Sequence, residues 1–174
     1  MLVIGYGNRH RGDDAAGVLA AEQLQGLGIP TRIHSGDPLA LIELWRGADD
    51  VILIDAVMTG APAGTIHNWD VNQILEAKES TTSTHGLGLA QAVKLARNLG
   101  TLPLKMRLYG IDGRKFYVGD GMSDEVKCAV QQVVSRIDAE IKGDNSHCKN
   151  RGRGLQESQK GDCDVTYDAK TISR

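Results

Sequence analysis

Short apolar runs bounded by glycine and polar residues recur along the chain, and each is the right length for one strand. Most are separated by stretches in which apolar residues return at helical spacing, a pattern typical of β-α units in a sheet covered on both faces. The pattern therefore predicts an α/β fold, a single-domain three-layer sandwich with a mostly parallel, roughly five-stranded sheet flanked by helices on both faces. The expected strands cover residues 2–7, 31–36, 51–57, 65–70 and 104–112.

The remaining periodic stretches predict helices over residues 13–28, 37–48, 85–100 and 123–143. The second of these has a clear start, with Asp37 as N-cap and Pro38 at the first helical position. The side chains expected to face the sheet are Ala16, Leu19, Ala20, Leu24 and Leu27 in the first helix, Leu89, Ala92, Val93 and Ala96 in the third, and Met122, Val126, Ala129, Val130, Val133, Ile137 and Ile141 in the last.

Length and composition place these elements in one domain, residues 1–143. A chain of 174 residues can bury enough surface to fold without disulfides or a structural metal. Residues 144–174 differ from the rest because they mix charges with only scattered apolar residues, and they cannot bury enough surface to offset their ordering entropy. We expect this C-terminal tail to be disordered.

The charge and the cysteines limit the binding partners and the cellular compartment that can be expected. The net charge of −2 is unlike the basic balance typical of nucleic-acid-binding domains. No charged segment followed by an apolar run marks a signal peptide at the start, and no apolar run is long enough for a membrane span. The three cysteines form neither a C-x-x-C pair nor an even framework. We therefore expect a cytoplasmic monomer with no nucleic-acid and no membrane partner.

The segment "VIGYGNRHRGDDAAG" at residues 3–17 begins like a dinucleotide-binding strand and turn. In a G-x-G-x-x-G fingerprint that starts at Gly5, the third glycine would be residue 10, which is His10 here. The helix that follows opens with Asp13 and Asp14, where a phosphate needs bare N–H groups and a positive field. The sequence therefore gives only weak support to a nucleotide-dependent α/β enzyme.

Three side chains are expected to meet at one edge of the sheet. In an open parallel sheet, ligands bind beyond the carboxyl ends of the strands, and Asp14, Asp55 and His85 all lie in segments that reach that edge. Two carboxylates and one imidazole form an incomplete coordination set for a divalent transition metal. Asp55 is the most informative, because a carboxylate inside the run "VILIDAV" costs free energy unless it has a partner.

Neighbouring candidates have more ordinary interpretations. Asp13 is interpreted as a cap or dipole partner of the first helix, and Arg9, His10 and Arg11 as a solvated basic loop. The glycines of the opening segment are expected to let the strand turn tightly. The remaining histidines are interpreted as surface residues, namely His10, His34, His67 and His147.

Familiar protease signatures are missing from the chain. It contains no H-E-x-x-H helix and no G-x-S-x-G elbow. Cys128 falls in the middle of a predicted helix, which is a structural position rather than that of an activated thiolate. A Ser, Cys or zinc-helix protease is therefore not indicated.

Three motifs carry a resemblance to a known family. "GYGNRHRGDDAAG" resembles the G-x-G-N-x-x-x-x-D-[DE]-x-x-G opening of the nickel–iron hydrogenase maturation endopeptidases, "LIDAV" is similar to their second acidic strand, and "STHGLGLAQAV" to their histidine loop and following helix. The motifs occur in the family's order and spacing, and the resemblance covers roughly residues 1–142.

The resemblance implies an endopeptidase that removes the C-terminal extension of a nickel-loaded [NiFe]-hydrogenase large-subunit precursor. It implies that Asp14, Asp55 and His85 are both the metal ligands and the catalytic residues. Nickel would be carried by the substrate and bound by the enzyme only weakly or transiently. The alternative is a non-enzymatic nickel carrier or scaffold in hydrogenase assembly, although such a protein normally adds thiolates or further histidines to its site.

Overall fold

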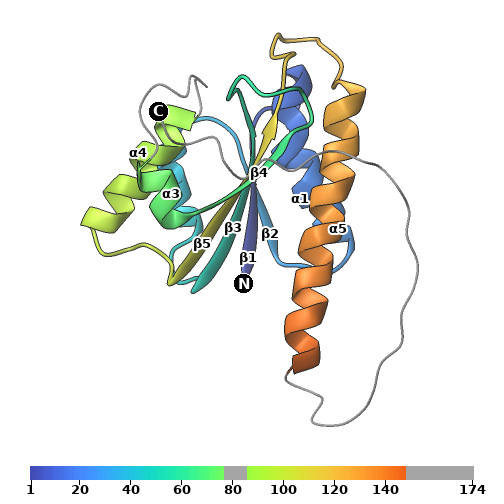
Figure 1. The fold of residues 1–174 in the computed structure, drawn as a ribbon. Helices are drawn as coiled ribbons and strands as arrows, with labels where there is room; N and C mark the ends of the chain where they lie inside the picture. The colour runs from blue at the N-terminus through green and yellow to red at the C-terminus, as the bar shows by residue number, and fades with distance from the viewer. Residues whose placement is uncertain (77–85, 148–174) are drawn as a thin grey trace.

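The computed structural model describes residues 1–76 and 86–147 (Figure 1). Five strands and a set of α- and 3-10 helices make up the described chain. In chain order they are β1 (Leu2–Tyr6), η1 (Gly12–Ala15), α1 (Ala16–Gly26), β2 (Thr31–His34), η2 (Pro38–Ala40), α2 (Leu41–Leu44), β3 (Asp50–Val57), β4 (Ile66–Asp70), α3 (Val71–Glu76), α4 (Gly86–Asn98), β5 (Lys105–Asp112) and α5 (Asp124–His147).

The strands form one sheet in the order β2-β1-β3-β5-β4. β1, β2, β3 and β5 run parallel, and only the edge strand β4 is antiparallel to its neighbour β5. All five predicted strands are therefore confirmed, as is the mostly parallel α/β class. Because the central strand β3 is buried along nearly its whole length, its sequence reads as an apolar run rather than an alternation.

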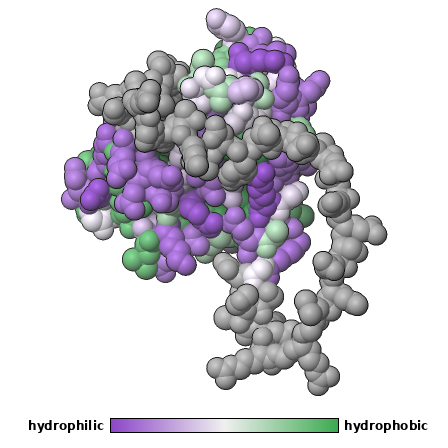
Figure 2. Space-filling model, in the orientation of Figure 1, coloured by the Kyte–Doolittle hydropathy of each residue, from purple (hydrophilic) through white to green (hydrophobic). Residues whose placement is uncertain are grey.

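Helices cover both faces of the sheet, which gives the predicted three layers (Figure 1). α1 and α5 lie on one face, and α3 and α4 lie on the other. β3 serves both cores, because Ile52 and Ile54 point to the first face while Val51 and Leu53 point to the second. Hydrophilic residues dominate the coloured part of the outer surface in Figure 2.

The apolar stripes of the predicted helices are largely confirmed. Ala16, Ala20 and Leu24 are buried, as are the four predicted core positions of α4 and most of those of α5. Leu27 is a correction, because it follows the end of α1 and is 54% exposed. None of the helices in the described part of the chain is long and apolar enough to cross a membrane.

Several helix boundaries differ from the prediction. The turn at Gly12–Ala15 is a 3-10 helix, so the regular α1 begins only at Ala16. The second helix is split in the same way into η2 and α2, although Asp37 does accept the expected capping hydrogen bond from the Leu39 N–H. α3 was not predicted, and α5 continues to His147, four residues past Gly143. The tail after residue 147 lies outside the described residues, so its disorder stays a prediction.

Glycine backbones let α1 lie directly against the sheet. A Cβ at Gly17 would lie 2.2 Å from the Ile54 carbonyl oxygen and 2.3 Å from that of Tyr6. A Cβ at Gly5 would lie 2.2 Å from the Gly17 carbonyl oxygen. This close approach needs glycine on both sides of the contact. It brings the start of the helical segment, with Asp14, over the carboxyl end of β3.

Candidate active site

Asp55 is a fully buried carboxylate near the carboxyl end of β3. Its exposed fraction is 0%, and neither oxygen accepts a hydrogen bond of ordinary geometry from the residues that the structure describes. Burial raises the pKa of Asp55 well above its usual value of 3.8, and the negative charge of Asp14 raises it further, while the adjacent Ala56 N–H lowers it. Asp55 is therefore a desolvated carboxylate. A carboxylate in this state is stabilised by any cation or proton that reaches it.

Asp14 lies beside Asp55, on the 3-10 turn η1. Its exposed fraction is 3%. The turn is held by backbone hydrogen bonds from Asn8 N–H to the Asp14 carbonyl oxygen (3.2 Å) and from Asp14 N–H to the Arg11 carbonyl oxygen (3.1 Å). Gly7 is required here, because its φ is +135° and a Cβ would lie 2.0 Å from the Asp14 carbonyl oxygen. The opening motif therefore positions one carboxylate over the strand that carries the other.

Arg11 is a cation close to Asp14. Its Nη1 lies 3.9 Å from Asp14 Oδ2, and its Nε donates to the Phe116 carbonyl oxygen at 3.0 Å. Arg9, by contrast, forms an ion pair with Glu22 on α1. The predicted solvated basic loop is therefore only partly correct, because two of its arginines have defined partners.

Tyr6 is a site residue that the sequence analysis missed. It is the last residue of β1, it is fully buried, and its hydroxyl donates to the Gly36 carbonyl oxygen at 2.5 Å. Burial, with the nearby charges of Asp55, Asp14 and Asp37, raises the pKa of Tyr6 to about 12. The phenol therefore stays protonated. The sequence could have indicated Tyr6, because Tyr6 ends a parallel strand at the same edge of the sheet as Asp55.

His85, the third predicted ligand, lies outside the described residues. The helix that follows it, α4, begins at Gly86 and packs on the face of the sheet that carries Leu53. Asp55 points to that same face, because side chains two positions apart on a strand share a face. In the part of the chain that is described, no group of three His, Cys, Asp or Glu side chains could hold a metal ion. The three-ligand set therefore stays a prediction, of which Asp14 and Asp55 are shown to be neighbours.

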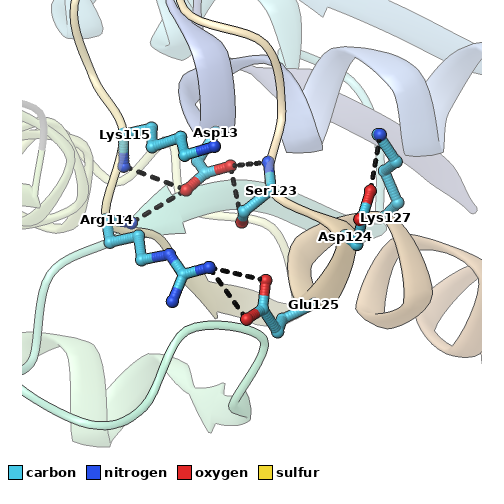
Figure 3. A network of polar contacts seen from close by, with 7 residues as sticks. All are labelled: Asp13, Arg114, Lys115, Ser123, Asp124, Glu125 and Lys127. Carbon is cyan, nitrogen blue, oxygen red and sulfur yellow. Dashed lines mark hydrogen bonds and ion pairs between the residues drawn. The ribbon is translucent and has the colours of Figure 1, made fainter.

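Asp13, although adjacent to Asp14, has a different role (Figure 3). Its side chain does not cap the helix, so of the two predicted roles the cap is wrong, although Asp13 does lie in the first turn, where an acid can interact with the helix dipole. Its carboxylate instead accepts hydrogen bonds from the backbone N–H groups of Arg114 (2.8 Å), Lys115 (3.0 Å) and Ser123 (2.7 Å), and from the Ser123 hydroxyl (2.9 Å). Burial alone would raise the pKa of Asp13, but these hydrogen bonds lower it below 3.8. Asp13 therefore fastens the β5–α5 loop, residues 113–123, to η1.

A second polar cluster lies at the same edge, around Asp112 at the end of β5. Asp112 is 1% exposed, and its oxygens accept from the N–H and the hydroxyl of Thr59, both at 2.8 Å. His67 Nε2 lies 2.6 Å from Asp112 Oδ2, and its ring stacks on Trp69. The interpretation of His67 as a surface residue without a partner is therefore wrong. The same nitrogen faces both Asp112 and Thr59, so this is not a triad in which an acid orients one ring nitrogen and the other activates a hydroxyl.

The chain is similar to proteins of one known family. The model of the hydrogenase maturation proteases matches residues 36–140, which is more than half of the chain. The chain belongs to the hydrogenase maturation protease family. The matched residues include Asp55 but not Asp14.

Individual relatives are similar to this chain over more of its length than the family model. A relative from Methanocaldococcus jannaschii that carries the name of a hydrogenase maturation protease is 27% identical over 151 residues, which covers 82% of this chain and 96% of the relative. The [NiFe] hydrogenase maturation protease HybD of Thermococcus kodakarensis has a similar structure, with a TM-score of 0.70 and 25% identity over 79% of this chain and 96% of that one.

A second solved structure shows the same fold. The hydrogenase maturating endopeptidase HybD of E. coli aligns with a TM-score of 0.69 and 23% identity, and the match covers 82% of this chain and 92% of that one. The resemblance carried by the three sequence motifs is therefore confirmed at the level of family and fold.

Proposed function

We propose that this protein is an endopeptidase that removes the C-terminal extension from a nickel-loaded precursor of a [NiFe]-hydrogenase large subunit. Membership of the maturation protease family supports the class of reaction. The observation that carries the rest is the buried carboxylate of Asp55. Among the described residues it has no hydrogen-bond donor of ordinary geometry, and it lies beside a second buried carboxylate, Asp14. A protein keeps such a costly pair where an incoming cationic group completes it.

Nickel enters this proposal as part of the substrate. Carboxylate and imidazole groups suit a divalent transition metal, and Asp14, Asp55 and His85 would bind the ion that the precursor carries. With few ligands of its own, the free protein is expected to bind nickel weakly, so that recognition depends on a precursor already loaded with metal. Bound beside the scissile peptide, nickel would supply a Lewis acid that polarises the carbonyl group.

The residues of this chain supply proton transfer and orientation. A carboxylate of this pair, Asp14 or Asp55, would accept a proton from the attacking water and return it to the amine that leaves. The products are then a new carboxyl terminus and the free extension. Tyr6 stays neutral near the two acids while its hydroxyl donates to the Gly36 carbonyl oxygen, and Arg11 orients Asp14 from the side of the β5–α5 loop. We place the reaction in the cytoplasm, in keeping with cysteines that form no disulfide framework.

The test is incubation with a nickel-loaded large-subunit precursor encoded in the same genome, followed by mass measurement of the product. The wild type should shorten the precursor, and Asp14→Asn and His85→Ala should slow shortening by roughly 100-fold or more. Asp49→Asn is the matched control, because Asp49 is exposed and precedes β3 at the opposite edge of the sheet. Circular dichroism checks that each variant is folded.

Two results would contradict the proposal. A wild type that leaves the mass of the precursor unchanged would not be a processing enzyme, and tight stoichiometric binding of nickel by that same protein would favour the carrier. Unfolded Asp14→Asn and His85→Ala variants would show that these residues support the fold rather than the reaction.

A further inference from the structure

Two large apolar side chains project from the loop that Asp13 fastens. Tyr117 is 81% exposed and Val118 is 79% exposed. They are adjacent in the β5–α5 loop, residues 113–123, which follows the carboxyl end of β5. Exposing two such side chains side by side gains nothing for the folding of the free protein, since apolar surface left in water contributes no burial.

The backbone of this loop is held in place. Besides the four hydrogen bonds to the Asp13 carboxylate, Asp13 N–H donates to the Lys115 carbonyl oxygen at 2.8 Å, and Gly119 N–H donates to the His10 carbonyl oxygen at 3.0 Å. The Tyr117 N–H donates to Asp120 Oδ2 at 3.1 Å. Phe116 packs against the core, on the side of α1 and α5. Binding at the tip would therefore require little ordering of the backbone.

The same contacts join the loop to the reactive edge of the sheet. Arg11 contacts both Asp14 and the Phe116 carbonyl oxygen. Gly12 is placed so close to the loop that a Cβ would lie 2.6 Å from the Lys115 carbonyl oxygen. In Figure 1 the loop rises above the sheet, beside the connection between β3 and β4. A protein that presents a peptide to Asp14 and Asp55 must therefore pass close to this tip.

The charges around the tip are of both signs, since Asp120 lies in the same loop and contacts the Tyr117 N–H. Lys115 lies in the loop itself, and His10 is hydrogen-bonded to it through the backbone. Arg114 is already neutralised by Glu125, at 2.8 Å. A partner with an apolar depression fits this surface, because tyrosine is favoured at the centres of protein interfaces.

We propose that Tyr117 and Val118 form a docking surface for the folded body of the precursor, separate from the residues that contact its scissile peptide. This inference rests on the proposed function for the identity of the partner. Part of the affinity for the precursor would then come from a contact that does not involve Asp14 or Asp55. A second copy of this chain is the other occupant that such a surface fits, and it is an outcome of the test.

The experiment compares a Tyr117→Ser/Val118→Ser double variant with Leu104→Ser. Leu104 is a matched control, because it is 86% exposed and lies just before β5, at the opposite edge of the sheet. The nickel-loaded large-subunit precursor is immobilised, and Kd is measured by biolayer interferometry while shortening is followed by mass. We expect the double variant to raise Kd and KM about tenfold or more with kcat little changed, as for loss of interface anchors. Leu104→Ser should stay within about twofold of the wild type.

Tyr117→Phe keeps the apolar ring and should bind like the wild type, which separates loss of contact from loss of fold. Equal Kd values for the double variant and Leu104→Ser would overturn the inference, as would a wild type that does not bind the precursor. A free wild type that sediments as a dimer, with the double variant monomeric, would assign the surface to self-association instead.

The two proposals can fail separately. Binding that depends on Tyr117 without any shortening would leave the docking surface standing and reject the proposed function. Shortening at equal efficiency by the wild type and the double variant would leave the function standing and reject the docking surface.

Discussion

Asp13 and Asp55 are both fully buried carboxylates at the same edge of the sheet, yet their surroundings are opposite. Asp13 accepts four hydrogen bonds from the β5–α5 loop, and its pKa is lowered. Asp55 has no such donors, faces the charge of Asp14, and its pKa is raised. Burial alone therefore does not identify a functional acid. The supply of hydrogen bonds separates a carboxylate that holds the fold together from one that we propose as a metal ligand.

The two carboxylates should act on stability in opposite directions as pH changes. Because the pKa of Asp13 is lower when folded than its usual 3.8, Asp13 stabilises the fold above that pH, and this contribution is lost as pH falls through the folded pKa. Because the pKa of Asp55 is higher when folded, the fold is favoured at low pH and loses stability as pH rises from 3.8 toward the folded pKa.

Asp13→Asn should produce the largest change in stability. The amide replaces an acceptor with a donor that faces N–H groups, so we expect a loss of about 3 kcal/mol in the free energy of unfolding. For a chain of this size, that corresponds to a fall in Tm of roughly 6–12 °C. Thermal melts at pH 7 measure it. An unchanged Tm would show that the loop is held by other contacts.

Asp55→Asn should have the opposite effect on stability while it abolishes processing. Removing the buried charge should raise the free energy of unfolding at pH 8 by about 1–2 kcal/mol. The gain should be smaller at pH 5 than at pH 8, because the raised pKa of Asp55 favours the protonated wild-type carboxyl group as pH falls. Chemical denaturation at the two pH values measures the difference. A variant that is less stable than the wild type at both would show that Asp55 supports the fold, and the contrast with Asp13 would fail.

Ser123→Ala should give the smallest effect. It removes one of the four hydrogen bonds to Asp13 and leaves the three backbone donors in place. We expect a loss of about 1 kcal/mol. Measured together with Asp13→Asn, it forms a double-mutant cycle, and the double variant should be little worse than Asp13→Asn alone. Fully additive losses would mean that Ser123 acts through another partner.

The strands and the longer helices were predictable because their signals are local. The apolar runs of β1 and β3 and the stripe of Leu89, Val93 and Ala96 carry their period in the sequence itself. Short elements were less predictable, since α3 has only six residues and the first turn of α1 tightens to a 3-10 helix at Asp13 and Asp14. Too few residues lie in such turns for a period to appear.

The sequence by itself determined the class of fold and brought Asp14 and Asp55 to one edge, because parallel strands end together and glycines at the opening motif permit close packing. Only the tertiary structure decided which of the neighbouring acids, Asp13 or Asp14, is bound into the fold. Their side chains are the same and adjacent, and what separates them is a loop about 100 residues further along the chain that reaches one and not the other. Long-range hydrogen bonds of this kind leave no periodic trace in a sequence.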